Sequence, residues 1–191
     1  YNEGERKWMG WERKRGKLED LNRFLLGEDP AVFSCVEGNT QTLSNVRYVI
    51  TRDADTIMAR ESACKMVGAM AHPLNRPIYD EKLGRVTGGH GSLQPRVDAN
   101  LSGANRSLYS RMCAGDIGID PYTTASSDVY QDLFDEGSVT GKGIYDVSLF
   151  DRAPGRRFPD NQTLSHPSLE GCVARSGLPG AVTLHEHPPH P

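Results

Sequence analysis

The chain has 191 residues, of which 37% are hydrophobic and 25% charged, and its net charge at pH 7 is −3. This length suffices for one domain with a buried core, and the negative balance gives no reason to expect a nucleic-acid partner or an anionic membrane surface. No apolar run approaches the roughly 20 residues that a spanning helix needs, so we expect no transmembrane segment in the chain.

The first part of the chain predicts alternating helices and strands. Residues 13–26 predict a helix, because leucines recur there at helical spacing and Gly27 provides a natural stop. Residues 46–52 predict a buried strand. Residues 57–71 predict a second helix, which the prolines of "HPLNRP" end, since a residue before proline disfavours the helical conformation.

The second part continues the alternation. "RVTGGHGSLQPRV" mixes strand-forming residues with glycine, as a hairpin or a bulged strand does, and "EGSVTGKGIYDVSLF" predicts a turn, a strand and a short helix. "HPSLEGCVARSG" predicts a helix with Pro167 at its first position and Gly177 just past its end. Residues 179–191, which include "LHEHPPHP", predict a disordered tail. Strands that alternate with helices indicate the α/β class.

The stretch "YVITRDADT" carries the first candidate site, because an apolar strand runs directly into Asp53 and Asp55. A turn after a strand is the commoner origin of two aspartates at this spacing. Open α/β sheets, however, place ligands at the carboxyl ends of their strands, and paired carboxylates suit the hard cations Mg²⁺ and Mn²⁺. We therefore expect both side chains to face one cleft at the end of a central strand and to share a divalent cation.

Two further motifs have two interpretations each. "GSVTGKG" is not a P-loop, because Gly143 occupies the Ser/Thr position; it is either a glycine turn that lets the backbone approach a ligand or a tight hairpin. In "ERKRGKLEDL" the acidic residues between the basic ones favour a solvated helix face, although Lys14 and Lys17 could also meet a phosphate.

Several stretches together resemble the glycosyltransferase region of cyclic β-1,2-glucan synthases, which are large multi-domain enzymes of the bacterial inner membrane. These stretches are "NEGERKWMGWERKRGKLEDLNRFLLG", "VRYVITRDADT", "MAHPLNRPIYD", "SLQPRV", "GIDPYTTASSDVYQDLF", "EGSVTGKGIYDV" and "LSHPSLEGCVARSGL". The layout is more distantly similar to that of processive family-2 glycosyltransferases such as cellulose synthase.

The resemblance implies a fold and a reaction. Residues 1–178 would form part of a GT-A-type, Rossmann-like glycosyltransferase domain, with a mixed sheet flanked by helices. The donor would be UDP-glucose and the acceptor a growing β-1,2-linked glucan. The transfer would be metal-dependent and inverting, at the cytoplasmic face of the bacterial inner membrane. Membrane segments and further domains of the parent protein would lie outside this chain.

The resemblance also assigns residues. Asp53 and Asp55 would hold the cation. Lys14, Gly16 and Asp53 would lie at the donor, and Gln94 and Gly141 at the acceptor side.

The chain departs from the family pattern at the catalytic base, because Pro167 stands where an aspartate is expected. Glu170 is a candidate substitute. The family's strands before residue 1, and its arginine- and tryptophan-bearing motif after the region of resemblance, have no counterpart in the chain. We therefore expect the chain alone to be inactive. The alternative function is that of a degenerate, non-catalytic domain that binds a sugar nucleotide or a protein partner.

Overall fold

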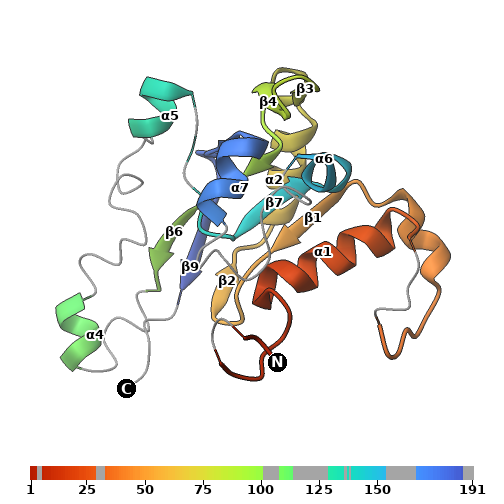
Figure 1. Cartoon of the computed structure of the whole chain (residues 1–191). Coiled ribbons are helices and arrows are strands. Elements are labelled where there is room, and N and C mark those ends of the chain that lie inside the picture. Colours follow the sequence, from red (N-terminus) through yellow and green to blue (C-terminus); the bar gives the residue numbers. More distant parts are fainter. Residues whose placement is uncertain are drawn as a thin grey trace.

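The protein is described here from a computed structural model that covers residues 1–3, 6–28, 33–100, 108–113, 129–135, 137, 139–153 and 167–186. Helices and strands are interspersed along these residues (Figure 1). The predicted α/β class, with mixed sheets and flanking helices, is confirmed. None of the described helices is both long and apolar enough to cross a membrane.

The bounds of the elements are as follows. The helices are α1 (Arg13–Leu25), η2 (Thr40–Asn45), α2 (Ser62–Ala71), η3 (Pro73–Asn75), α4 (Leu108–Cys113), α5 (Val129–Phe134), α6 (Val147–Arg152) and α7 (Pro167–Ala174). The strands are β1 (Tyr48–Thr51), β2 (Thr56–Met58), β3 (Ile78–Asp80), β4 (Arg85–Gly88), β5 (Ser92–Leu93), β6 (Arg96–Ala99), β7 (Gly143–Asp146), β8 (Ser176–Gly177) and β9 (Thr183–Glu186).

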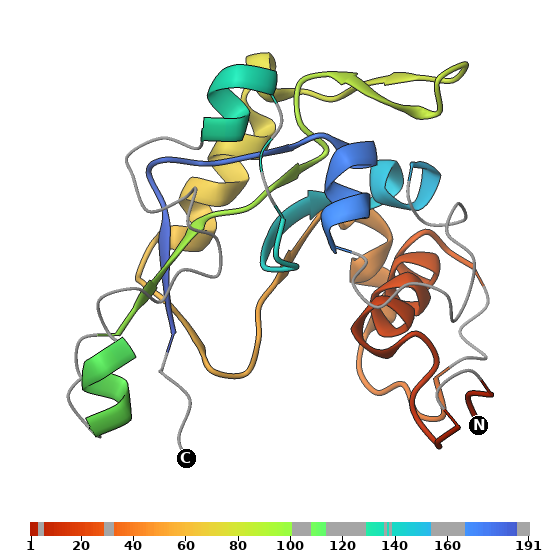
Figure 2. The ribbon, with the colours of Figure 1, turned by 60° about the vertical axis from the view of Figure 1, so that its left-hand side comes forward.

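The described strands form three sheets. The first has the order β1-β7-β5-β8 and is mixed, since β7 is antiparallel to both β1 and β5 whereas β5 and β8 are parallel. The second has the order β2-β9-β6, in which β9 is antiparallel to β2 and parallel to β6. The third is the hairpin of β3 and β4, which projects from the body of the protein (Figure 2).

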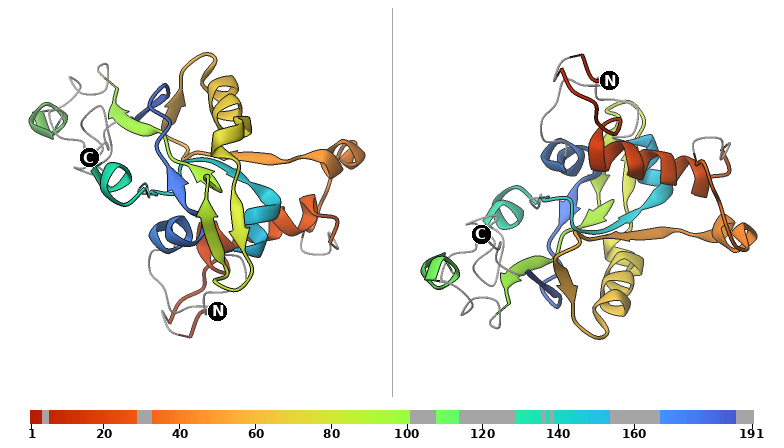
Figure 3. Two further views of the ribbon diagram at one scale, coloured as in Figure 1. Left: turned by 90° about the horizontal axis from the view of Figure 1, so that it is seen from above. Right: turned by 90° about the horizontal axis from the view of Figure 1, so that it is seen from below.

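Helices cover both faces of the first sheet. Side chains of consecutive strand residues point to opposite faces, and in β7 Ile144 packs against Met66 and Met70 of α2, whereas Tyr145 packs on the side of Leu25 of α1. Figure 3 shows α1 and α2 on opposite sides of the strands. The buried side chains of β7 thus divide the core into two apolar layers, one on each face.

The first predicted helix is confirmed, and its end has a local cause. Helix α1 ends at Leu25, and the N–H groups of Leu26 and Gly27 donate to the carbonyl oxygens of Asn22 and Phe24. Gly27 has a φ of +88°, a left-handed conformation that glycine adopts without steric cost. The predicted stop at Gly27 is therefore correct.

The second predicted helix is shorter than expected. Helix α2 begins at Ser62, and Thr56–Met58 form strand β2 instead of its first turn. Two features explain the difference. Glu61 has a left-handed φ of +68°, which interrupts helical geometry, and β2 pairs with β9, a partner about 130 residues away in the sequence.

The prediction of a disordered tail from residue 179 is wrong for Thr183–Glu186, which form strand β9. Val182 and Leu184 are 3% and 2% exposed, and β9 lies between β2 and β6. Burial of these two apolar side chains and hydrogen bonding to two strands fix a segment whose composition suggests flexibility. Residues 187–191 lie outside the described part of the chain.

A candidate cation and donor site

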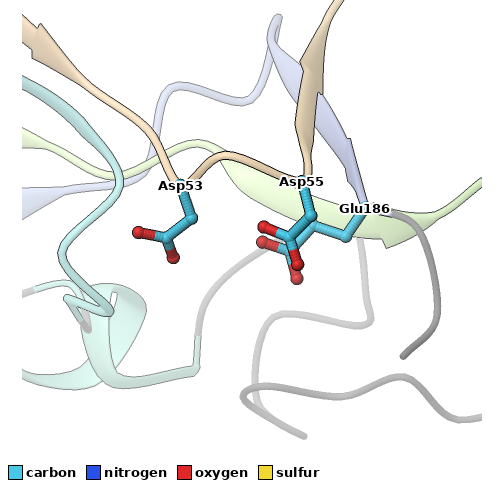
Figure 4. A group of neighbouring side chains, drawn as sticks. All are labelled: Asp53, Asp55 and Glu186. Carbon is cyan, nitrogen blue, oxygen red and sulfur yellow. The ribbon is translucent and has the colours of Figure 1, made fainter. Parts of the chain in front are cut away.

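The carboxylates of Asp53 and Asp55 lie close together in the structure, next to that of Glu186. Both lie in the turn between β1 and β2, and Glu186 ends β9 (Figure 4). One carboxylate oxygen from each residue lies within 4.8 Å of the other two. The two aspartates therefore lie close together, whereas the shared cleft and the bound cation stay predictions. The expected central strand is wrong for the described sheet, because β1 is its terminal strand and pairs with β7 alone.

Strand register brings these residues together. Thr56 pairs with Glu186, so Glu186 lies beside the residue that follows Asp55. The hydroxyl of Thr56 also donates to Glu186 Oε1 at 3.2 Å. At the other end of the turn, Thr51 pairs with Gly143, which places the segment before β7 next to Asp53.

Two ammonium groups neutralise Asp53. Lys14, in the first turn of α1, donates to Asp53 Oδ1 at 2.6 Å and to the carbonyl oxygen of Gly141 at 2.9 Å. Lys142 Nζ lies 3.3 Å from Asp53 Oδ2 and also donates to Glu186 Oε1. Lys14 therefore contacts both Asp53 and Gly141, two further residues predicted from the resemblance.

Burial and charge act in opposite directions on the ionisable groups here. Burial alone would raise the pKa of Asp53, but the hydrogen bonds and charges of Lys14 and Lys142 outweigh it and lower that pKa. Burial alone would lower the pKa of Lys142, but Glu186 and Asp53 outweigh it and raise that pKa. Both groups are therefore charged at neutral pH.

Glu186 was not predicted from the sequence. It is 8% exposed and forms part of β9, in the segment that composition assigns to a disordered tail. The alternation of apolar Val182 and Leu184 with Thr183 and His185 is the one local signal for that strand. Nothing in the sequence links its last residue to the aspartate pair, because their proximity depends on the pairing of β2 with β9.

Gln94 positions the segment that carries Gly141. Its Oε1 accepts hydrogen bonds from the backbone N–H groups of Thr140 and Lys142, at 3.1 and 3.2 Å, and its Nε2 donates to the Pro95 carbonyl. Gln94 is 5% exposed. The structure therefore places the two residues predicted for the acceptor side next to each other, whereas their contact with an acceptor stays a prediction.

Gly16 has a packing role. A Cβ atom at this position would lie 2.1 Å from the carbonyl oxygen of Trp11, so no larger residue fits without movement of the chain before α1. Contact of Gly16 with a donor stays a prediction.

The predicted start of α7 at Pro167 is confirmed, and Glu170 follows in its first turn. Glu170 lies 3.7 Å from Arg15 Nε and lines a cavity with Gln94, Gly141 and Lys142. Burial raises the pKa of Glu170 to about 7; Arg15 opposes this rise and Glu19 adds to it. The cavity therefore joins the candidate substitute base to the segment beside Asp53.

Comparison with known proteins gives the site a context. No protein-family model matches the chain. The cyclic β-(1,2)-glucan synthase NdvB of Rhizobium meliloti (strain 1021) is 44% identical over 187 residues, or 97% of the chain, and the chain spans 6% of that protein's length. The resemblance predicted from the sequence is confirmed: the chain is homologous to one segment of a cyclic β-(1,2)-glucan synthase.

Proposed function

We propose that the chain is part of a GT-A-type glucosyltransferase domain that uses UDP-glucose to extend a β-1,2-linked glucan. The transfer is inverting and needs Mg²⁺ or Mn²⁺. The parent protein carries membrane segments and further domains and works at the cytoplasmic face of the bacterial inner membrane. The similarity to a cyclic β-(1,2)-glucan synthase supports this proposal at the level of glucan synthesis.

The observation that carries the proposal is the meeting of three distant segments at Asp53. Lys14 of α1 and Lys142 before β7 approach its two oxygens, while Glu186 of β9 lies beside Asp55. Carboxylates and ammonium groups gathered in this way suit a ligand that combines a cation with phosphate groups.

The residues fit a divalent cation. Asp53, Asp55 and Glu186 offer oxygen atoms that lie within 4.8 Å of one another, and oxygen is the ligand that Mg²⁺ and Mn²⁺ prefer. When bound, such a cation would neutralise the negative charge of the departing diphosphate. Lys14, whose side chain is 43% exposed, is free to reorient from Asp53 toward a donor phosphate.

Glu170 is a candidate substitute for the missing aspartate, which would take the proton from the acceptor hydroxyl. A pKa of about 7 suits a general base at neutral pH, because the group is partly ionised and still basic enough to accept a proton. Pro167, at the position where the resemblance expects an aspartate in this role, has no ionisable group. We therefore expect the isolated chain to be inactive or very slow.

A second function is favoured by the same proline. A domain without the expected base can bind a sugar nucleotide, or a protein partner, without transferring a sugar. The carboxylates and ammonium groups around Asp53 would serve this non-catalytic function equally well. A measurement of activity must therefore distinguish the catalytic from the non-catalytic function.

The test places the chain in a complete synthase. The matching segment of the Rhizobium meliloti enzyme is replaced by this chain, and incorporation of labelled glucose from UDP-glucose is measured with Mn²⁺ and with a chelator. We expect Pro167→Asp to raise the rate at least tenfold, because positioned general bases contribute about 10²–10⁴-fold. Ser168→Asp, which adds a carboxylate at the next position, serves as the control.

Other results would change the conclusion. If the proline form is as fast as the aspartate form and Glu170→Gln abolishes its activity, Glu170 is the base. If the Pro167→Asp chimera folds but transfers no glucose, the non-catalytic function is favoured.

A further inference from the structure

We propose that Lys142 is a built-in counter-ion, whose ammonium group occupies the cation position between Asp53 and Glu186 until a divalent cation displaces it. The inference rests on the proposed function, since it concerns the same cation site. It adds Lys142 to a site to which neither the aspartate pair nor the resemblance assigns this residue. It also predicts that the Lys142 ammonium group competes with the divalent cation for the carboxylates.

The geometry places the ammonium group where an ion would lie. Lys142 Nζ contacts both Asp53 Oδ2, at 3.3 Å, and Glu186 Oε1. These two carboxylates and that of Asp55 offer oxygen atoms within 4.8 Å of one another. A cation shared by the three carboxylates would therefore need much of the space that this ammonium group now fills.

Electrostatics explains why an ammonium group is needed there. Three neighbouring carboxylates repel one another unless a positive charge lies among them, and a buried lysine is stable only when it is paired. The Lys142 side chain is 8% exposed and that of Glu186 is 11% exposed, so this pair is shielded from solvent. Of the three carboxylates, Lys14 contacts only that of Asp53, and at 43% exposure this ion pair is weaker.

Displacement of the Lys142 ammonium group requires movement of the Lys142 side chain only. The backbone N–H of Lys142 is held by Gln94 Oε1 at 3.2 Å, which fixes the segment while the side chain rotates. A lysine ammonium group is a compact charge on a flexible four-carbon chain, so it can leave the cluster without unfolding the loop. Its two ion pairs must be broken when the cation enters, and this cost lowers the affinity for the cation.

The experiment measures Mn²⁺ binding to the chain by calorimetry. We expect Lys142→Met to bind Mn²⁺ about tenfold more tightly than the wild type, a change of about 1.4 kcal/mol. Lys142→Arg, which restores a positive charge, should return the affinity to about the wild-type value. Lys65→Met makes the same chemical change on the exposed side of α2 and should leave the affinity unchanged. A folded Lys142→Met variant that binds Mn²⁺ equally or more weakly would overturn the inference.

A second measurement covers the case in which Lys142→Met does not fold. The ¹³Cε signal of Lys142 is followed by NMR in the wild-type chain as Mg²⁺ is added, with the Lys65 signal as the internal control. We expect the Lys142 signal to shift as the site fills, and a static signal at saturation would overturn the inference. If the wild type and Lys142→Met both bind no Mn²⁺, the cation site itself is wrong. If only the effect of Lys142→Met is missing, the proposed cation site stands without the counter-ion.

Discussion

Glu170, a half-buried residue in the first turn of α7, links the fold to the proposed chemistry. It lines the cavity beside Gln94 and a second cavity that includes Arg15 and Glu19. Its charge also contributes to the raised pKa of Tyr145, for which burial is the larger cause and the hydrogen bond to Asn22 an opposing one. Glu170 of α7 is therefore coupled electrostatically to Arg15 of α1 and to Tyr145 of β7.

The stability of the protein should depend on pH through Glu170. The folded-state pKa of about 7 exceeds the ordinary value of 4.5, so the stability gained by protonation is fully present below pH 4.5 and is lost as the pH rises through 7. The unfolding free energy of the wild type should fall between pH 4.5 and 8. In the Glu170→Gln variant this fall should be about 2–3 kcal/mol smaller. Urea unfolding at both pH values measures this, and an unchanged difference would contradict the assignment.

Gln94 should matter for stability because it accepts two backbone hydrogen bonds. Gln94→Ala leaves the N–H groups of Thr140 and Lys142 without their acceptor in a buried place, which costs about 1–3 kcal/mol for each unsatisfied group. We expect a lower unfolding free energy, measured by urea denaturation. Gln41→Ala, at an exposed position, is the control and should change it little. Equal effects of the two changes would mean that Gln94 does not hold the segment.

At the scale of the elements, local sequence patterns correctly predicted the helices and strands that local interactions determine. Helix α1 follows from leucine spacing and a glycine stop, and β7 with α6 follows from an apolar run that Asp146 ends as the cap of α6. Strands β2 and β9 were missed, because each depends on a partner far away in the sequence. Strands as short as these contain too few residues for a clear periodicity, so the folded arrangement is needed to identify them.

Strand β9 should therefore contribute strongly to stability, although composition suggests a flexible tail. Leu184→Ala removes a side chain that is 2% exposed and leaves a cavity, which typically costs about 2–5 kcal/mol. Ile57→Ala, in the neighbouring strand at 39% exposure, is the matched control and should cost less. Thermal unfolding of the wild type and the two variants measures these losses of stability. Equal melting temperatures for the Leu184→Ala variant and the wild type would contradict the placement of β9 in the core.

At the scale of the whole molecule, the candidate site is assembled from segments at both ends of the described chain. The sequence alone indicates Asp53 and Asp55, because they are neighbours and follow an apolar strand. It does not indicate Glu186 or the ammonium group of Lys142, which the strand pairings β2–β9 and β1–β7 bring to the aspartates. The resemblance assigned Lys14 to the donor; in the structure Lys14 contacts Asp53, and its contact with a donor stays a prediction.

The central claim is that the carboxylates of this cluster hold a divalent cation, and Asp55 is the residue at which to test it. Its side chain is exposed, and no ion pair or hydrogen bond of this side chain is found within the described residues, so Asp55→Asn should leave the fold intact. The measurement is a titration with Mn²⁺ followed by electron paramagnetic resonance, with Asp132→Asn on the exposed surface of α5 as the control. We predict that Asp55→Asn weakens Mn²⁺ binding at least tenfold, a loss of about 1.4 kcal/mol or more, while Asp132→Asn has no effect. Equal Mn²⁺ affinity in the wild type and the Asp55→Asn variant would contradict the claim.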